Sequence, residues 1–332
     1  MNSSQSSRFL ALGICSLIAL ASAQALHAED KAPLVPGTTI EIPGSQGKFD
    51  FLEIDPVKHR LLASHEKDAT ADIFDLKTNK LLGRVEVGEA MEIAVDQKTG
   101  KYFVSINDKQ KVAIVDPTSL KEVNSIPLTG PLDGIIIDPK NRHLFAAHDD
   151  GTELWVIDAE TEKLIGTVTI PGAPEYMVYD SATDRIYLNI KVTDEVVVID
   201  PESNKVIAHI PTAPAKKPHG LAIDSASGRL FSAGANGELA VIDIKSGKVI
   251  SSVKIASGVD QIAIDSELRR IYCASGNATL SVVQETADGA VLVGNVKTAT
   301  GAKSVAVDPQ THAVWLTYTD GKSAFAKSWV AP

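Results

Sequence analysis

The chain has 332 residues, and 32 Lys and Arg against 42 Asp and Glu give it a formal net charge of −10 at pH 7. Proteins that bind nucleic acid neutralise phosphates with clustered Lys and Arg, so this balance argues against a nucleic-acid partner. The sequence has two cysteines and no C-x-x-C-H segment, which excludes a disulfide framework and a covalently attached haem.

The first 28 residues have the pattern of an export signal. Arg8 precedes an apolar run over Phe9–Ala21, and small residues follow, so cleavage is expected after Ala23, Ala25 or Ala28. The run is shorter than the ~20 residues that a membrane-spanning helix needs, so we expect no transmembrane segment. The pattern predicts a periplasmic or secreted protein.

The remaining residues, 29–332, form one repetitive domain. A short apolar segment ending in Asp recurs at intervals of 41 to 44 residues. The aspartates that end these segments are Asp55, Asp96, Asp138, Asp180, Asp224, Asp265 and Asp308. A period of ~40–50 residues with several short strands per unit is typical of a β-propeller with one blade per repeat. We therefore predict an all-β, seven-bladed β-propeller.

Each repeat contains segments for four antiparallel strands. The apolar segment ending in Asp comes first, a second apolar segment follows a turn, and a third ends in another Asp. After this second Asp the pattern D-x-x-[ST]-x-K predicts a hairpin, because Asp and Ser or Thr side chains bind nearby backbone amides in tight turns. The pattern begins at Asp75, Asp116, Asp158, Asp200 and Asp243. The fourth segment alternates polar and apolar residues, as an exposed outer strand should.

Two repeats are irregular. The sixth has Gln284 in place of the second Asp, with Asp288-Gly289 as its predicted turn. The seventh reaches Pro332 without a fourth segment, whereas Gly37–Gly44 near the other end matches the fourth segments of other repeats. We predict that this N-terminal strand completes the last blade, because closing the ring removes a free sheet edge.

Repeat units that read GLAIDxxxxRLxxA and then ELAVIDxxSGKVI resemble the YVTN-repeat family of seven-bladed propellers, the YncE-like exported proteins of bacteria. The resemblance covers about Gly37 to Trp329. It implies a periplasmic or secreted propeller. The functions it implies are varied: single-stranded DNA binding, surface-layer association and accessory roles near redox enzymes.

Variable polar residues lie where the mouth of the central channel is predicted. In a propeller, the start of the inner strand and the end of the second strand reach the same face. A repeat needs the same residue type for packing in every blade, so variable polar residues at these positions are candidates for function. The ligand-binding candidates at the inner-strand starts are Asp50, Glu92, Asp133, Glu175, Asp260 and Lys303.

Three histidines lie at the same two positions in the repeat. His65 and His148 end second strands, and His219 starts an inner strand. Imidazole and carboxylate are the usual ligands of Zn²⁺ and similar ions, so a divalent metal held by His65, His148 and His219 is one prediction. The alternative is a hydrated polar funnel that merely finishes the strand ends.

Two functions remain open from the sequence. The first is a binding or scaffold protein that holds a small molecule or a periplasmic protein at the channel mouth. The second is a metal-dependent hydrolase or lyase at the same mouth, with Glu175, Tyr176 and Tyr318 as candidate acids or bases. The sequence does not decide whether the protein is an enzyme. We expect a monomer.

Overall fold

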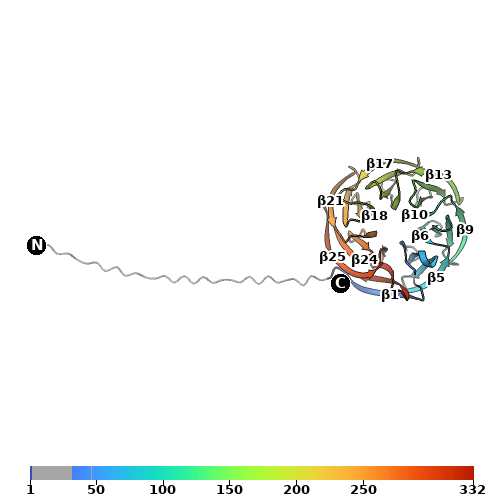
Figure 1. Cartoon of the computed structure of the whole chain (residues 1–332), viewed down its shortest axis with the longest axis horizontal. Helices are drawn as coiled ribbons and strands as arrows, with labels where there is room; N and C mark the ends of the chain where they lie inside the picture. Colours follow the sequence, from blue (N-terminus) through green and yellow to red (C-terminus); the bar gives the residue numbers. More distant parts are fainter. Residues whose placement is uncertain (2–31, 46) are drawn as a thin grey trace. The chain divides into compact units, whose positions relative to one another are not determined.

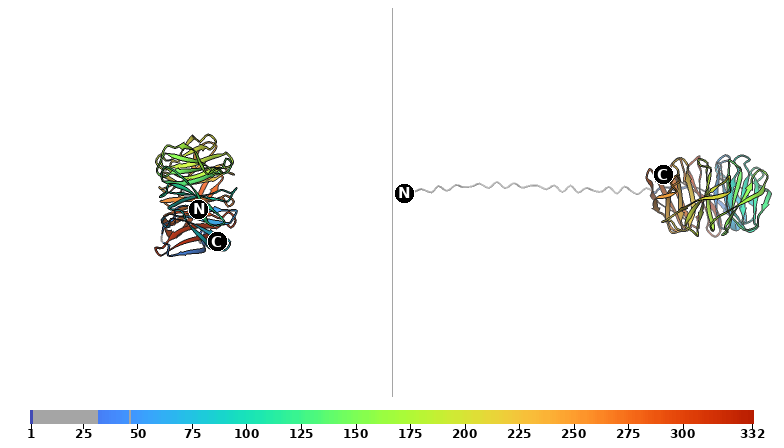
Figure 2. Two further views of the ribbon diagram at one scale, coloured as in Figure 1. Left: turned by 90° about the vertical axis from the view of Figure 1, so that its right-hand side faces the viewer. Right: turned by 90° about the horizontal axis from the view of Figure 1, so that it is seen from above.

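The computed structural model describes Met1, residues 32–45 and residues 47–332. The predicted export signal over residues 1–28 lies outside the described residues except for Met1. Residues Ala32–Pro332 form one compact unit, in which seven four-stranded antiparallel sheets surround a common centre (Figure 1). Figure 2 shows the same ring from its edge. Among the described residues, no helix is long and apolar enough to cross a membrane.

The strands follow the predicted order within each blade. The inner strands are β2 (Leu52–Asp55), β6 (Ala90–Val95), β10 (Leu132–Asp138), β14 (Pro174–Asp180), β18 (Pro218–Asp224), β22 (Val259–Asp265) and β26 (Val305–Val307). The second strands are β3 (Arg60–His65), β7 (Tyr102–Ile106), β11 (His143–His148), β15 (Arg185–Ile190), β19 (Arg229–Gly234), β23 (Arg270–Ser275) and β27 (Val314–Thr319).

The third and fourth strands complete the blades. The third strands are β4 (Thr70–Asp75), β8 (Lys111–Asp116), β12 (Glu153–Asp158), β16 (Glu195–Asp200), β20 (Glu238–Asp243), β24 (Asn277–Thr286) and β28 (Ser323–Val330). The outer strands are β5 (Lys80–Glu86), β9 (Lys121–Pro127), β13 (Lys163–Thr169), β17 (Lys205–Pro211), β21 (Lys248–Lys254), β25 (Gly289–Thr300) and β1 (Val35–Pro43). The prediction of seven blades with four antiparallel strands each is confirmed.

The hydrophobic core lies between neighbouring sheets. Phe103 and Ile114 of the second blade, for example, pack with Leu144 and Trp155 of the third, and all four are almost fully buried. Each sheet is therefore covered by a neighbouring sheet on both of its faces. This burial explains why most positions of the first three strands in each blade are apolar.

The ring is closed by the N-terminal strand, as predicted. β1 pairs antiparallel with β28, in register from Thr39 opposite Lys327 to Pro43 opposite Ser323. Ile40 and Ile42 of β1 are buried and share a cluster with strands of the first blade. The last blade thus draws its outer strand from the start of the chain, and the closing strand also contacts the neighbouring blade.

Aspartates organise the face of the ring where the inner strands end. The second aspartates close hairpins as predicted: Asp158 accepts the backbone N–H groups of Glu160 and Thr161, both at 2.8 Å. These hydrogen bonds, led by that from Thr161, lower the pKa of Asp158. In the sixth blade the turn is Ala287-Asp288, one residue earlier than predicted, because Gly289 already pairs with Thr286 in the sheet.

The first aspartates join neighbouring blades on this same face. Asp308 Oδ2 lies 2.7 Å from Nε2 of His59, which ties the seventh blade to the first. Arg142 of the third blade reaches back to Asp96 of the second at 2.6 Å. On this face the first aspartates therefore serve as structural contacts between blades, whereas the variable polar residues singled out from the sequence lie at the opposite face, where the inner strands begin.

Candidate functional site

Five of the predicted ligand-binding residues meet at the face where the inner strands begin. We call Asp50, Asp133, Glu175, Asp260 and Lys303 the mouth cluster. The Lys303 Nζ atom lies 2.6 Å from Asp50 Oδ1 and 2.5 Å from Asp260 Oδ2. Burial lowers the pKa of Lys303, but these two carboxylates outweigh it and raise the pKa above its ordinary range. Lys303 is therefore a permanent cation between two carboxylates from different blades.

The other side of the mouth contains a second ion pair. The Glu175 Oε1 atom lies 2.8 Å from Nζ of Lys191, which also lies 2.8 Å from Asp150 Oδ1. His219 Nε2 is 3.9 Å from the same Glu175 oxygen. Burial raises the pKa of Glu175, and the proximity of His219 and Lys191 reduces that rise. Lys191 was not among the predicted site residues, although it directly follows the last residue of the second strand β15.

Asp133 differs from the other carboxylates of the mouth cluster. In the described part of the chain, no cation or hydrogen-bond donor contacts its carboxylate, although the side chain is half-buried. Burial raises the pKa of Asp133 well above its usual range, and the nearby charges of Asp50 and Glu175 raise it further. The mouth cluster therefore has an acidic group whose ionised form is not compensated.

Two aromatic rings meet behind the mouth cluster. Phe51 and Tyr176, from the first and fourth blades, stack with their centroids 5.5 Å apart. The Gln261 side chain fixes this region, because its Nε2 donates to the Leu52 carbonyl at 3.0 Å and its Oε1 accepts the Val305 N–H at 3.0 Å. The first and fourth blades lie on opposite sides of the propeller, so the two aromatic side chains meet across the channel and form a floor beneath the mouth.

Below this floor lie two adjoining cavities of about 380 and 280 Å³. Both are lined by Glu53 and Tyr176, and Glu92 borders the larger one. Glu92, a predicted mouth residue, thus faces this lower space, where its Oε2 accepts the Ile135 N–H at 2.6 Å. Burial raises the pKa of Glu92 well above its usual range and that of Glu53 to about 7. Tyr176 has its pKa raised for the same reason, so its hydroxyl is a hydrogen-bond donor rather than a base at neutral pH.

The raised pKa of Glu53 makes stability depend on pH. Its folded pKa of about 7 exceeds the ordinary 4.5, so the native state binds the extra proton between these values. Glu53 therefore destabilises the fold as pH rises through about 7. The substitution Glu53→Gln keeps the Oε1 acceptor for the Ile54 N–H. It should raise the free energy of unfolding at pH 8 by about 2 kcal/mol and change it little at pH 5, as measured by urea denaturation.

Asp243→Asn provides the control with opposite sign. Hydrogen bonds from the Ser246 side chain and backbone lower the pKa of Asp243, so its loss should destabilise the protein at pH 8 rather than stabilise it. Equal unfolding free energies of wild type and Glu53→Gln at pH 8 would contradict the argument for Glu53.

His65 does not reach the mouth cluster. It ends β3 as predicted, but its side chain is fully buried, with Nδ1 2.7 Å from Asp72 Oδ2 and Nε2 3.0 Å from the Gly47 carbonyl. Ser45 Oγ lies 3.3 Å from the same Nε2, an order of groups found in serine hydrolases. Ser45 is 2% exposed and donates to Asp68, so the network secures the loop between β1 and β2 and offers no accessible nucleophile.

The other candidates for metal binding and acid–base chemistry are dispersed. His148 is part-exposed and its ring lies 5.0 Å from that of Trp155, whereas His219 donates from Nδ1 to the Lys217 carbonyl. Tyr318 stacks on Phe325 of β28, one strand farther out in its blade. Within residues 32–45 and 47–332, no three His, Cys, Asp or Glu side chains are grouped as a metal site would require. The structure therefore does not bring His65, His148 and His219 together.

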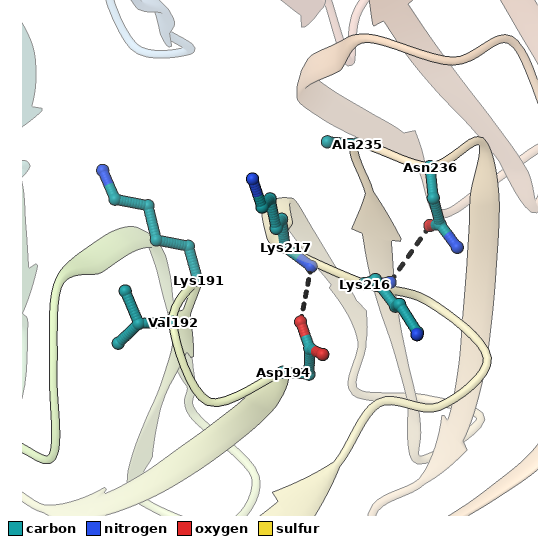
Figure 3. Close-up of a pocket in the computed structure, with 7 residues that line it drawn as sticks. All are labelled: Lys191, Val192, Asp194, Lys216, Lys217, Ala235 and Asn236. Carbon is teal, nitrogen blue, oxygen red and sulfur yellow. Dashed lines mark hydrogen bonds between the residues drawn. The ribbon is translucent and has the colours of Figure 1, made fainter.

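A hollow of about 760 Å³ opens beside the mouth cluster, between the fourth and fifth blades. It is lined by residues that we call the lysine pocket: Lys191, Val192, Asp194, Lys216, Lys217, Ala235 and Asn236. In the view of Figure 3 the side chains of Lys191 and Lys217 extend upward from their two loops, whereas that of Lys216 extends downward and its backbone N–H donates to Asn236. From sequence, Lys216 and Lys217 could be placed near the mouth, but the hollow needs three separate loops and is visible only in the structure.

Comparison with known proteins identifies the fold. No protein-family model matches the chain, and no curated protein matches it in sequence. Among solved structures, a chain of hydrazine synthase from Kuenenia stuttgartiensis is similar, with a TM-score of 0.74 and 15% sequence identity over 88% of this chain and 96% of that one. At this identity the similarity establishes the β-propeller architecture and no more.

Proposed function

We propose that this protein is an exported β-propeller of the YVTN type that binds a ligand carrying a cationic group at the mouth cluster. The repeat pattern supports the family, and the signal-like pattern over residues 1–28 supports a periplasmic or secreted location. The observation that supports binding most directly is the half-buried, unpartnered carboxylate of Asp133, with Glu175 and Asp50 nearby.

The charges of the mouth cluster favour a cation over an anion. Four carboxylates face one another there, and among the described residues Lys303, the adjoining Lys191 and His219 lie against three of them and none lies against Asp133. Uncompensated carboxylates in a region of low dielectric repel one another, and a ligand ammonium group beside Asp133 would relieve that repulsion. The floor of Phe51 and Tyr176 closes the site from behind and offers aromatic faces, which also attract cations.

The metal-dependent hydrolase or lyase has no comparable support. Its three proposed imidazole ligands lie in different surroundings, and one of them, His65, is committed to Asp72 and the Gly47 carbonyl. We therefore propose binding rather than catalysis as the role of the mouth.

Calorimetric titration with a panel of primary and quaternary ammonium compounds tests this proposal. The substitution Asp133→Asn keeps the size of the side chain but cannot ionise to pair with an ammonium group, so it should weaken binding of the ammonium compound by about tenfold or more. Asp158→Asn, the same change in a hairpin on the opposite face, should leave binding unchanged. The proposal fails if no compound of the panel binds at millimolar concentration, or if both variants bind as wild type does.

A further inference from the structure

The lysine pocket lies beside the mouth cluster but has the opposite charge. Within the described residues, no carboxylate lies within 4 Å of the Nζ atom of Lys216 or Lys217, and both side chains are exposed in the hollow. The whole chain carries a net charge of −10, so two adjacent lysines without acidic partners form a local excess of positive charge on an otherwise acidic protein. An isolated pair of this kind attracts anions.

The backbone holds these two lysines in place. The Lys217 N–H donates to Asp194 Oδ1 at 2.6 Å, and the Lys216 N–H donates to Asn236 Oδ1 at 3.0 Å. Lys217 has a φ of 47°, in the left-handed region that residues with a Cβ rarely adopt. The two hydrogen bonds keep the loop in this conformation, which directs consecutive side chains to different sides of the hollow (Figure 3).

Lys191 of the neighbouring blade borders the same hollow. Burial lowers its pKa, but the carboxylates of Asp150 and Glu175 outweigh this effect and raise it above the ordinary range, so the side chain stays charged. The Lys191 ammonium group is already bound by these two carboxylates, each at 2.8 Å, so within the described residues Lys217 is the cation of the pocket that remains open to an anion.

The remaining wall of the hollow is apolar. Val192 is 64% exposed and, with Ala235, borders the same space as the lysines. A volume of about 760 Å³ is within the usual range for small-molecule sites, roughly 300–1,000 Å³. We propose that the lysine pocket binds a small organic anion, whose phosphate or carboxylate group lies beside the ammonium group of Lys217 and whose apolar body packs on Val192. This site goes beyond the cation site proposed at the mouth cluster and does not depend on it.

Calorimetric titration of the full-length protein tests the site with three probes: phenyl phosphate, phthalate and inorganic phosphate. We expect at least one of the two organic anions to bind more tightly than inorganic phosphate, because inorganic phosphate has no apolar body to pack on Val192. The double variant Lys216→Met/Lys217→Met should weaken that binding by about tenfold or more, and Lys217→Met alone should account for most of the loss. Tighter binding of phenyl phosphate than of phthalate would assign phosphate esters, and the reverse order would assign carboxylates.

Lys245→Met/Lys248→Met is the matched control. It removes two lysines from the same blade, but at the opposite face, since Lys248 pairs with Asp243 at the end of the sheet remote from Pro218. Equal weakening by the two double variants would overturn the proposal, because it would show a general effect of charge, and so would the absence of binding by both organic probes at millimolar concentration. Asp133→Asn should leave phenyl phosphate binding intact, which distinguishes failure of this site from failure of the mouth cluster.

Discussion

Deletion of residues 37–44 is expected to lower the melting temperature by roughly 10 °C or more, or to cause aggregation. The deletion removes most of β1, and with it the hydrogen-bonded register between β1 and β28. Ile40 and Ile42, which are 7% and 3% exposed, would also leave the core, at a cost of about 1.5–3 kcal/mol each. The edge of β28 would then be free to pair with other chains, so aggregation should accompany unfolding. Calorimetry and light scattering measure the two effects.

Substitutions within β1 show whether the deletion acts by removing the buried side chains that close the ring or by a nonspecific effect of truncation. Ile40→Ala/Ile42→Ala should destabilise the protein by about 4 kcal/mol or more, because both side chains pack against the first blade. Thr39→Ala changes an exposed position of the same strand, β1, and should alter the free energy of unfolding by no more than about 0.5 kcal/mol. If the variant without residues 37–44 has the same melting temperature as the wild type, the N-terminal strand does not hold the ring closed.

The architecture could be predicted from the sequence because the same strand and turn pattern recurs in every repeat. The apolar segment, the terminal aspartate and the hairpin pattern recur, so an irregular unit is read with the help of the regular ones. The sixth blade shows the limit: without the second aspartate, the turn was predicted one residue late, at Asp288-Gly289 instead of Ala287-Asp288. A local signal in one repeat determines a turn less well than a pattern repeated around the ring.

The candidate site was only partly predictable, because position in the repeat places a side chain at the mouth but does not determine its partner. The start of each inner strand correctly identified Asp50, Asp260 and Lys303 as neighbours. The position of His65 at the end of a second strand wrongly predicted that its side chain reaches the mouth. The loop before β2 covers this side chain and supplies the Gly47 carbonyl as its partner. Loops whose sequences differ from one repeat to the next decide such contacts. Lys191, in one of these loops, was therefore missed.

Replacement of Lys303 by Met is expected to destabilise the protein by about 2–3 kcal/mol at pH 8. Removing one partner of a buried ion pair leaves the other charge uncompensated, which costs about 3–5 kcal/mol in a fully buried pair. The Lys303 and Asp260 side chains are 26% and 30% exposed, so solvent screening should reduce the loss to a value below that range. Urea denaturation of the variant and wild type measures the difference.

The same substitution should have a much smaller effect at pH 5. Burial raises the pKa of Asp50 from 3.8 to about 6 even with Lys303 beside it, so the native state holds the Asp50 proton at pH 5 and releases it as pH rises through about 6. Without Lys303 that release becomes costlier, and the loss of stability should grow between pH 5 and pH 8. Asp50→Asn/Lys303→Met removes both charges and should recover part of the stability at pH 8. A loss that is equal at both pH values, with no recovery in the double variant, would mean that Lys303 acts through packing of its aliphatic chain and not through its charge.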